Sequence, residues 1–268
     1  MRNINPLCLF SYPLFDQGIL TIWTPNTLHK YTSVASHSDP FCQQISVLEV
    51  SIKNLGNTLP RDKTKANDKA ALAANVLLGR LPNLVSLRID FEELSITNTR
   101  RMFHGLLLPN LTGFFTNTLP HSALTNFIIH HPQLTALTLG PSPKCLRSSQ
   151  GCPLKKCSPI QTLIEIEGPS KCAARLIGPQ TSRIAALWSG SADDHQDLFA
   201  RAATVQPPIQ SVLRFIDIVF TGFCESLLNN IAQAAPSVTT LRLRELGAGA
   251  VTVCRYHTFR IRVMLTLS

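Results

Sequence analysis

Apolar and polar positions follow a fixed order after several prolines of the chain. After Pro82, Pro132 and Pro236, apolar residues stand at the second, fifth and seventh positions, so the pattern P-x-L-x-x-L-x-L occurs three times. The last part of the pattern alternates apolar and polar residues, as a strand with one buried face does. Each copy therefore predicts a short strand after a turn that contains proline.

The same pattern recurs at a regular distance. Weaker copies start at Pro109, Pro159 and Pro208, and the segment from Ser182 supplies one more unit. The six intervals between Pro82 and Pro236 average just under 26 residues. Leucine-rich repeats have a period of about 20 to 29 residues and the strand signature L-x-x-L-x-L, so both features agree.

The segments between these strands are typical of helices. Four of them end at or just before a proline, where a helix must stop; they are residues 67–80, 122–131, 191–205 and 222–235. One unit cannot bury its own apolar face, so stacked right-handed units predict a parallel sheet with helices outside. We therefore predict an α/β fold, a leucine-rich-repeat solenoid or horseshoe with a parallel concave sheet, outer helices and about seven or eight irregular repeats.

The repeat pattern divides the chain into three parts. Residues 45–246 form the predicted repeat domain, in which an early strand at 45–52 is joined to the first clear repeat by a polar insertion at 61–69. Residues 1–44 show no convincing repeat and are predicted to be a poorly ordered segment or degenerate cap. Residues 247–268 are either a final edge strand or a tail foreign to the fold, and the sequence does not choose between them.

Composition excludes some classes of protein. With 44% hydrophobic and 15% charged residues, 268 residues can bury a substantial core. The net charge of +9 is not gathered into one basic patch, so we expect no nucleic acid and interpret the charge as a bias toward solubility and acidic partners. No apolar stretch reaches the roughly 18 residues of a membrane span, and the start is a poor signal peptide. The eight cysteines are scattered, mostly in apolar segments, which predicts reduced thiols in the cytoplasm or nucleus.

Several longer motifs add a resemblance to a known family. They are "LLGRLPNLVSLRI", "FIIHHPQLTALTLG", "IEGPSKCAARLIGP" with "RIAALWSG", and "LLNNIAQAAPSVTTLRLREL". Over roughly residues 45–246 the chain resembles the leucine-rich-repeat part of fungal, particularly basidiomycete, F-box-type proteins. The resemblance implies a substrate-recognising or scaffold domain, often beside an F-box that docks to a Skp1-like adaptor in a cullin ubiquitin ligase. Residues 1–44 show no F-box helices, so we expect such an adaptor only if an F-box exists in a longer product.

Polar side chains that alternate with the leucines are the candidate binding residues. They should lie on the concave face of the sheet, where a protein partner can reach them, although any single one could simply be solvated. The predicted set is Arg88, Asp90, Thr138, Glu165, Glu167, Arg242 and Arg244. The sequence has none of the motifs G-x-S-x-G, G-x-x-x-x-G-K-[ST] or H-E-x-x-H, so we predict a monomeric, non-enzymatic protein-interaction module without cofactor or metal. The alternatives are a basic nucleic-acid-associated protein and a truncated fragment without function of its own.

Cysteine and histidine clusters were the remaining candidates for chemistry. Cys145, Cys152 and Cys157 have the spacings C-x6-C and C-x4-C, which miss the C-x2-C of a zinc knuckle, so ordinary thiols in a surface insertion are expected. The pair His130 and His131 ends a helix, and we expect these rings to cap its last carbonyls. The acids around His195 would spread over several helix faces, so no active site is predicted there.

Overall fold

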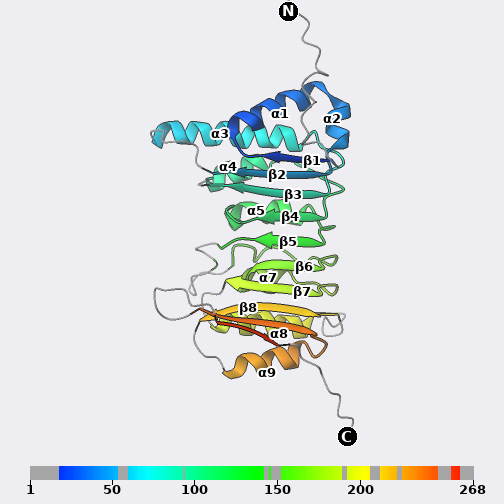
Figure 1. Ribbon diagram of the computed structural model, residues 1–268, viewed down its shortest axis with the longest axis vertical. Coiled ribbons are helices and arrows are strands. Elements are labelled where there is room, and N and C mark those ends of the chain that lie inside the picture. Colours follow the sequence, from blue (N-terminus) through cyan, green and yellow to red (C-terminus); the bar gives the residue numbers. More distant parts are fainter. Residues whose placement is uncertain are drawn as a thin grey trace, which may run out of the picture.

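The computed structural model describes residues 18–53, 60–92, 94–141, 145, 152–188, 192–205, 212–221, 225–246 and 255–259. Its strands form one sheet of ten strands whose order in space is their order in the chain (Figure 1). They are β1 (Ile19–Ile22), β2 (Val47–Ile52), β3 (Ser86–Phe91), β4 (Gly113–Thr116), β5 (Ala136–Leu139), β6 (Glu165–Pro169), β7 (Arg183–Trp188), β8 (Phe215–Thr221), β9 (Thr240–Leu246) and β10 (Arg255–Phe259). Neighbours from β1 to β9 pair in parallel, and β10 pairs antiparallel to β9.

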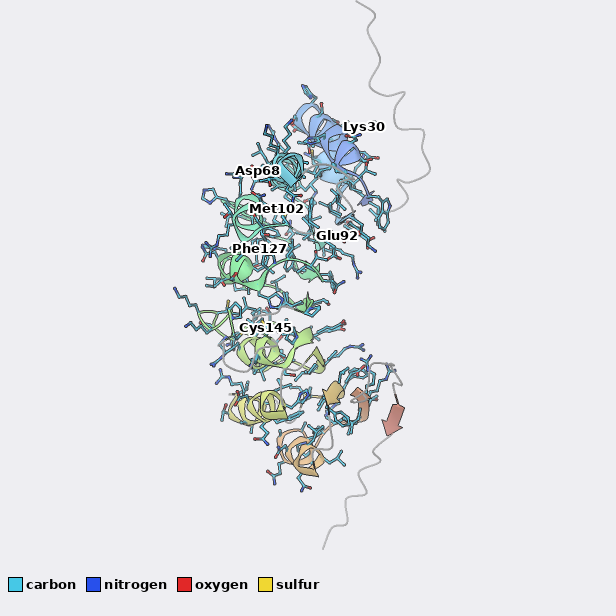
Figure 2. All side chains as sticks on the ribbon, turned by 90° about the vertical axis from the view of Figure 1, so that its left-hand side faces the viewer. Lys30, Asp68, Glu92, Met102, Phe127 and Cys145 are labelled. Carbon is cyan, nitrogen blue, oxygen red and sulfur yellow. The ribbon has the colours of Figure 1, made fainter. Side chains whose placement is uncertain are left out.

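Helices form a second layer on one face of this sheet. They are α1 (Pro25–His37), α2 (Asp39–Gln44), α3 (Pro60–Leu78), α4 (Ile96–Met102), α5 (His121–Ile129), α7 (Ser170–Leu176), α8 (Ala192–Thr204) and α9 (Glu225–Ala234). In the side view the helix layer bows outward and the strands lie along the inner side of the bend (Figure 2). One face of the strands is thus covered by helices, and the other is open and concave.

The strands from β2 to β9 each begin at the same backbone link to the unit before it. The carbonyl of Val85 accepts hydrogen bonds from the N–H groups of Thr112 and Gly113, and the carbonyl of Thr112 accepts from Thr135 and Ala136. The same two-donor arrangement occurs at the carbonyls of Gly18, Ser46, Thr135, Ile164, Ser182 and Arg214. This repeated link fixes the register in which successive units stack.

The residue after the proline adds a second link between units. Asn83 donates through its side-chain amide to the Gln43 carbonyl, and Asn110 donates likewise to the Pro82 carbonyl, at 2.9 and 3.0 Å. Gln133 makes the same kind of bond to the Leu108 carbonyl at 2.9 Å. In these three units the proline-marked turn connects the unit to the previous one, and the polar residue after proline belongs to the fold.

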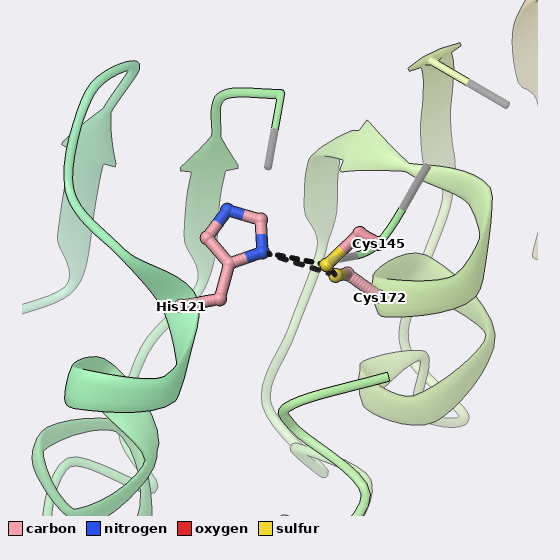
Figure 3. Close-up of side chains that lie close together, drawn as sticks. All are labelled: His121, Cys145 and Cys172. Atoms are coloured by element: carbon pink, nitrogen blue, oxygen red, sulfur yellow. Dashed lines mark hydrogen bonds between the residues drawn. The ribbon is translucent and has the colours of Figure 1, made fainter. Parts of the chain in front are cut away.

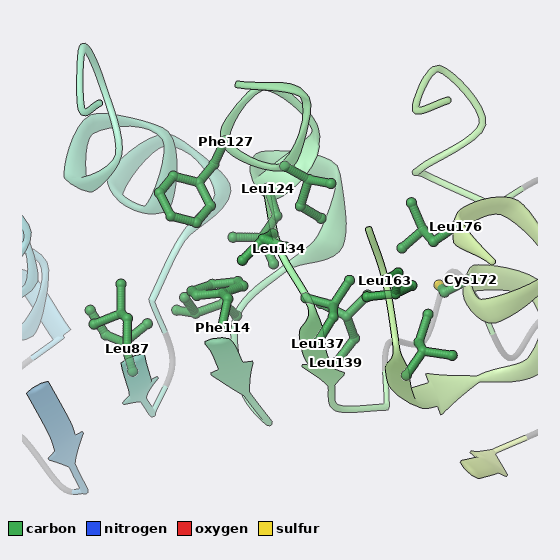
Figure 4. Packing of buried hydrophobic residues seen from close by; sticks show 14 of the residues in the cluster. Leu87, Phe114, Leu124, Phe127, Leu134, Leu137, Leu139, Leu163, Cys172 and Leu176 are labelled. Carbon is green, nitrogen blue, oxygen red and sulfur yellow. The ribbon is translucent and has the colours of Figure 1, made fainter. Parts of the chain in front are cut away.

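The core lies between the strands and the helices and is continuous along the solenoid. Strand residues such as Leu87 and Leu137 point toward the helices (Figure 4). The ring of Phe114 is fully buried, with its centroid 4.9 Å from that of Phe127 and 5.8 Å from that of Phe103. Close packing extends to the backbone: a side chain at Gly140 would overlap the Asn117 carbonyl, so only glycine fits there.

The predicted α/β arrangement of repeats with a parallel sheet and outer helices is confirmed. All predicted strands between residues 45 and 246 are present, although the proline at 208 lies outside the described residues. Three details differ from the prediction. The polar segment 61–69 is not an insertion but the first half of α3, and the helices α4 and α7 have no counterpart among the predicted ones.

The two ends also extend the sheet. Residues 18–44, predicted to be poorly ordered or a degenerate cap, form β1, α1 and α2, and β1 pairs with β2 in the same parallel sense as the later units. Parallel repeat strands therefore number nine in the described part of the chain, one or two more than predicted. At the other end residues 255–259 form the antiparallel edge strand β10, whereas residues 1–17, 247–254 and 260–268 of the predicted end segments lie outside the described residues.

Candidate functional site

The open face of the sheet carries side chains that lie in rows across the strands. In one row Arg88 on β3 is opposite Phe115 on β4, and in the continuation of that row Thr138 on β5 is opposite Glu167 on β6. The row ends with Asp217 on β8 opposite Arg242 on β9. Because the strands are parallel and in register, residues far apart in the sequence become neighbours on this face.

Charged and aromatic residues gather at one end of the open face. We call these residues the β6–β9 cluster, and its members are Glu165, Glu167, Arg183, Phe215, Asp217, Arg242 and Arg244. Arg183 is the centre of one half of it: its Nε lies 2.8 Å from Glu165 Oε1, and its guanidinium carbon lies 4.1 Å from the centroid of the Phe215 ring. Arg242 lies 5.3 Å from the same ring, so two guanidinium groups contact one aromatic side chain.

The other half of the cluster is a partly buried ion pair. Asp217 is only 7% exposed, and a single carboxylate oxygen accepts from both Nε and Nη2 of Arg244, at 3.0 and 2.9 Å. Loss of Arg244 would leave a nearly buried carboxylate without a counter-charge, which is far more costly than loss of an exposed partner. The Glu165–Arg183 pair is about half exposed on both sides and contributes little to stability.

Burial and the neighbouring charges change the pKa of the Glu167 carboxyl. Partial burial raises the pKa of the Glu167 carboxyl, and the negative charges of Glu165 and Asp217 act in the same direction. The cations of Arg183 and Arg244 lower it but do not cancel the other effects. The cluster thus holds an acid whose charged form is disfavoured, in contrast to the well-paired Asp217.

Four of the seven predicted binding residues belong to this cluster: Glu165, Glu167, Arg242 and Arg244. Arg88 and Thr138 lie on the same open face further toward the N-terminal end, and Arg88 is 5.6 Å from the Phe115 ring. Asp90 has a different contact: its Oδ1 accepts from the Asn117 backbone N–H and from the hydroxyls of Thr116 and Thr118. It therefore holds the turn after β4 and is less available to a partner.

Three members of the cluster were missed by the sequence analysis. Arg183 alternates with Ile184 in the unit that begins at Ser182, so the same alternation would have found it. Phe215 and Asp217 flank Ile216, but the buried positions of this unit stand three residues later after Pro208 than they do after the prolines of the clear copies. The displacement hid which side of β8 is open.

Three histidines in or just after helices make hydrogen bonds that stabilise the fold. Nδ1 of His130 and of His131 lies 2.6 and 2.7 Å from the carbonyls of Asn126 and Phe127, so the predicted capping is confirmed. His195 is buried between Ser170 Oγ, 3.0 Å from its Nδ1, and the Val219 carbonyl, 3.1 Å from its Nε2. This ring connects α7, α8 and β8.

The cysteines of the 145–157 segment are not on the surface. Cys145, Cys152 and Cys157 are all buried, so their predicted place in a surface insertion is wrong. Cys145 and Cys172 meet the ring of His121 (Figure 3). Hydrogen bonds with Cys145 and Cys172 lower the pKa of the Cys152 thiol, whereas hydrogen bonds with Cys145 and Cys152 raise the pKa of the Cys172 thiol.

Comparisons with known proteins leave the family open. No family model matches the chain, and no curated protein matches it. Among solved structures, a chain of the complex described as "Crystal structure of Rad7 and Elc1 complex in yeast" is similar at 10% identity and a TM-score of 0.23, over 81% of this chain and 83% of that one. A score this low does not establish a shared fold. No helix in the described residues is long and apolar enough to cross a bilayer.

Proposed function

We propose that the chain is a non-enzymatic protein-interaction module whose open strand face binds one partner protein, with the β6–β9 cluster at the centre of the contact. The observation that carries the proposal is the pair of arginines on Phe215. Arginine and aromatic residues are enriched among the residues that dominate binding energy. Here Arg183 and Arg242 are already held against the ring, so less side-chain freedom is lost when a partner binds.

Charge on this face favours a protein partner over nucleic acid. Arg183 and Arg244 each contact a carboxylate, and Glu167 adds a further acid between them. A phosphate backbone approaching the cluster would meet Glu165, Glu167 and Asp217 as well as the arginines, so few counterions would be released. A protein surface with both signs of charge and an apolar centre is complementary to this arrangement.

We further propose that the repeats are of the leucine-rich type and that the partner is a substrate of an F-box-type ubiquitin ligase. The period, the strand signature and the resemblance of residues 45–246 support this finer assignment. In that case a Skp1-like adaptor binds an F-box in a longer product, away from the open face. Adaptor and substrate would then respond differently to changes in the β6–β9 cluster.

The test is affinity capture from fungal lysate with variants of equal charge. Arg183→Glu with Arg242→Glu reverses two charges on the open face, whereas Lys155→Glu with Arg175→Glu reverses two exposed charges away from that face. We expect a partner that the wild type and the second variant retain and the first variant loses. Equal retention of every captured protein by both variants would refute the assignment of this face, provided that circular dichroism shows both to be folded.

A further inference from the structure

Four metal-ligating side chains meet in the core on the helix side of β5 and β6. They come from separate segments: His121 is the first residue of α5, Cys145 and Cys152 lie in the connection between β5 and β6, and Cys172 lies on α7. All four are buried, with exposures of 1%, 1%, 6% and 0%. This group is separate from the open strand face.

The ligand atoms are already close to one another. His121 Nδ1 lies 3.1 Å from Cys145 Sγ and 3.3 Å from Cys172 Sγ, and all three atoms lie within 4.8 Å of one another (Figure 3). Cys172 Sγ lies 3.3 Å from Cys145 Sγ and 3.5 Å from Cys152 Sγ. In a tetrahedral zinc site with Zn–S near 2.3 Å and Zn–N near 2.0–2.1 Å, ligand atoms are about 3.5–3.8 Å apart. The atoms of His121, Cys145 and Cys172 would need to move outward by only a few tenths of an ångström to accommodate the ion. Cys152, which contacts the sulfur of Cys172, would have to turn its thiol toward the ion to complete the set.

Hydrophobic packing alone does not explain why these side chains are buried in the core. Nε2 of His121 is buried without a hydrogen-bond partner in the described structure, although the Gly140 backbone lies close enough to the ring to influence its pKa. Leaving a polar group in this state is costly, and an apolar side chain would fill the space at lower cost. A metal bond at Nδ1 would offset the cost of burying the imidazole, although it leaves Nε2 as the N–H side of the ring.

Supporting contacts around the sulfurs are also in place. The backbone N–H of Leu154 points at Cys152 Sγ at 3.4 Å, and hydrogen bonds of this kind orient and stabilise metal-bound thiolates. Cys157, by contrast, turns its Sγ toward the Thr125 carbonyl at 3.9 Å, and burial raises the pKa of its thiol to about 11. It lies outside the ligand set.

We propose that His121, Cys145, Cys152 and Cys172 bind one zinc ion as a closed structural Cys3His site. Three thiolates and one imidazole are a common donor set for structural zinc, and the depth of the site leaves no position for a substrate. The ion would join α5, the β5–β6 connection and α7, which are consecutive elements of the solenoid. The assignment replaces the sequence-based expectation of no metal.

Sequence spacing could not show this site because its ligands come from different repeats. His121 precedes Cys145 by 24 residues and Cys172 follows it by 27, which is one unit in either direction. Only Cys145 and Cys152 belong to the cysteine cluster visible in the sequence. Stacking of the units brings the outer two ligands to them.

The experiment measures metal in the full-length chain purified under reducing conditions. We expect about one zinc per chain by plasma mass spectrometry and, after exchange with Co²⁺ alone, the intense visible absorption of tetrahedral cobalt with thiolate charge-transfer bands. Cys172→Ser and His121→Phe should each lower zinc to below about 0.1 per chain, whereas the matched control Cys157→Ser keeps it.

A second measurement covers the case in which the ligand variants do not fold. The zinc is first removed from the wild type with a chelator. Circular dichroism then shows whether the metal-free chain is folded, and the chain is titrated with Zn²⁺. Recovery of fold or a rise in melting temperature at one equivalent supports the site. Three results would overturn it: a folded chain without zinc or a cobalt spectrum, unchanged zinc in Cys172→Ser, or a Cys145–Cys172 disulfide in the native, metal-free protein by mass spectrometry.

Discussion

His131 connects two units of the solenoid through a fully buried ring, and its replacement tests how the units are held together. Nε2 accepts a hydrogen bond from the Leu108 backbone N–H at 3.1 Å, and Nδ1 donates to the Phe127 carbonyl at 2.7 Å. The imidazole centroid is 4.2 Å from the Phe127 ring. His131→Phe retains a ring of similar shape but removes both hydrogen bonds.

The expected loss of stability follows from these two bonds. The substitution leaves the Leu108 N–H without its acceptor and the Phe127 carbonyl without its side-chain donor, and each buried unsatisfied group costs about 1–3 kcal/mol. We therefore expect His131→Phe to lower the free energy of unfolding by about 2–6 kcal/mol. The matched control is His130→Phe: this neighbouring ring bonds the Asn126 carbonyl in the same way but is exposed, so water replaces the bond and the change stays within about 0.5 kcal/mol.

The protonation of His131 also makes the stability of the fold depend on pH. Burial lowers the pKa of His131, with the charge of His130 adding to the effect and the Phe127 carbonyl opposing it. The unfolded chain therefore takes up a proton at a higher pH than the folded chain, so stability is lost as the pH falls below the ordinary value near 6.5. His131→Phe should therefore reduce this loss.

The assay is equilibrium unfolding in urea, followed by circular dichroism between pH 5 and 8. A free energy of unfolding for His131→Phe within about 0.5 kcal/mol of His130→Phe at pH 7.5 would refute the reasoning. If the free energy of unfolding falls as steeply with decreasing pH in His131→Phe as in the wild type, His131 is not the cause of the pH dependence.

Three further changes test other parts of the structure. Phe114→Ala should lower the free energy of unfolding by about 3–5 kcal/mol, because the ring is fully buried among other aromatic rings, and urea titration would reveal a smaller effect if this layer were loosely packed. Gly140→Ala should cost about 1–3 kcal/mol or more through overlap with the Asn117 carbonyl, whereas Gly79→Ala at the end of a helix should be nearly neutral in the same titration. Glu167→Gln should stabilise the chain at pH 7: the raised pKa of Glu167 means that the folded state loses stability as the pH rises above about 4.5, and this decline should be weaker in the variant. If stability declines with rising pH equally in Glu167→Gln and the wild type, Glu167 is not the cause of that decline.

The strands of the solenoid could be predicted because their pattern is local. The strands from β1 to β9 have buried positions two residues apart, such as Leu87 and Ile89. In the clear copies a proline also stands between the preceding helix and the strand. The short helices α4 and α7 lack this signal: seven residues do not complete two turns, and Ile96 is only half-buried. Their conformation depends on packing against neighbouring units.

The candidate sites were harder to predict for a related reason. The alternation along a strand predicts which side chains face outward, and it placed Arg242 and Arg244 on the open face. It does not tell which outward residues of different strands become neighbours, so the contacts of Arg244 with Asp217 and of Cys172 with His121 could not be foreseen. Repeats of unequal length set those neighbours, and only the register of the sheet shows them.

The central claim is that the open strand face binds the partner protein, and the affinity of the captured partner for single-site variants tests it most directly. Arg183→Ala removes a guanidinium that is held on Phe215, and we predict that the dissociation constant measured by titration calorimetry rises at least about tenfold, which equals about 1.4 kcal/mol. Arg175→Ala on α7 should leave it unchanged. A dissociation constant within about twofold of the wild-type value for Arg183→Ala would contradict the claim that the open strand face is the binding surface.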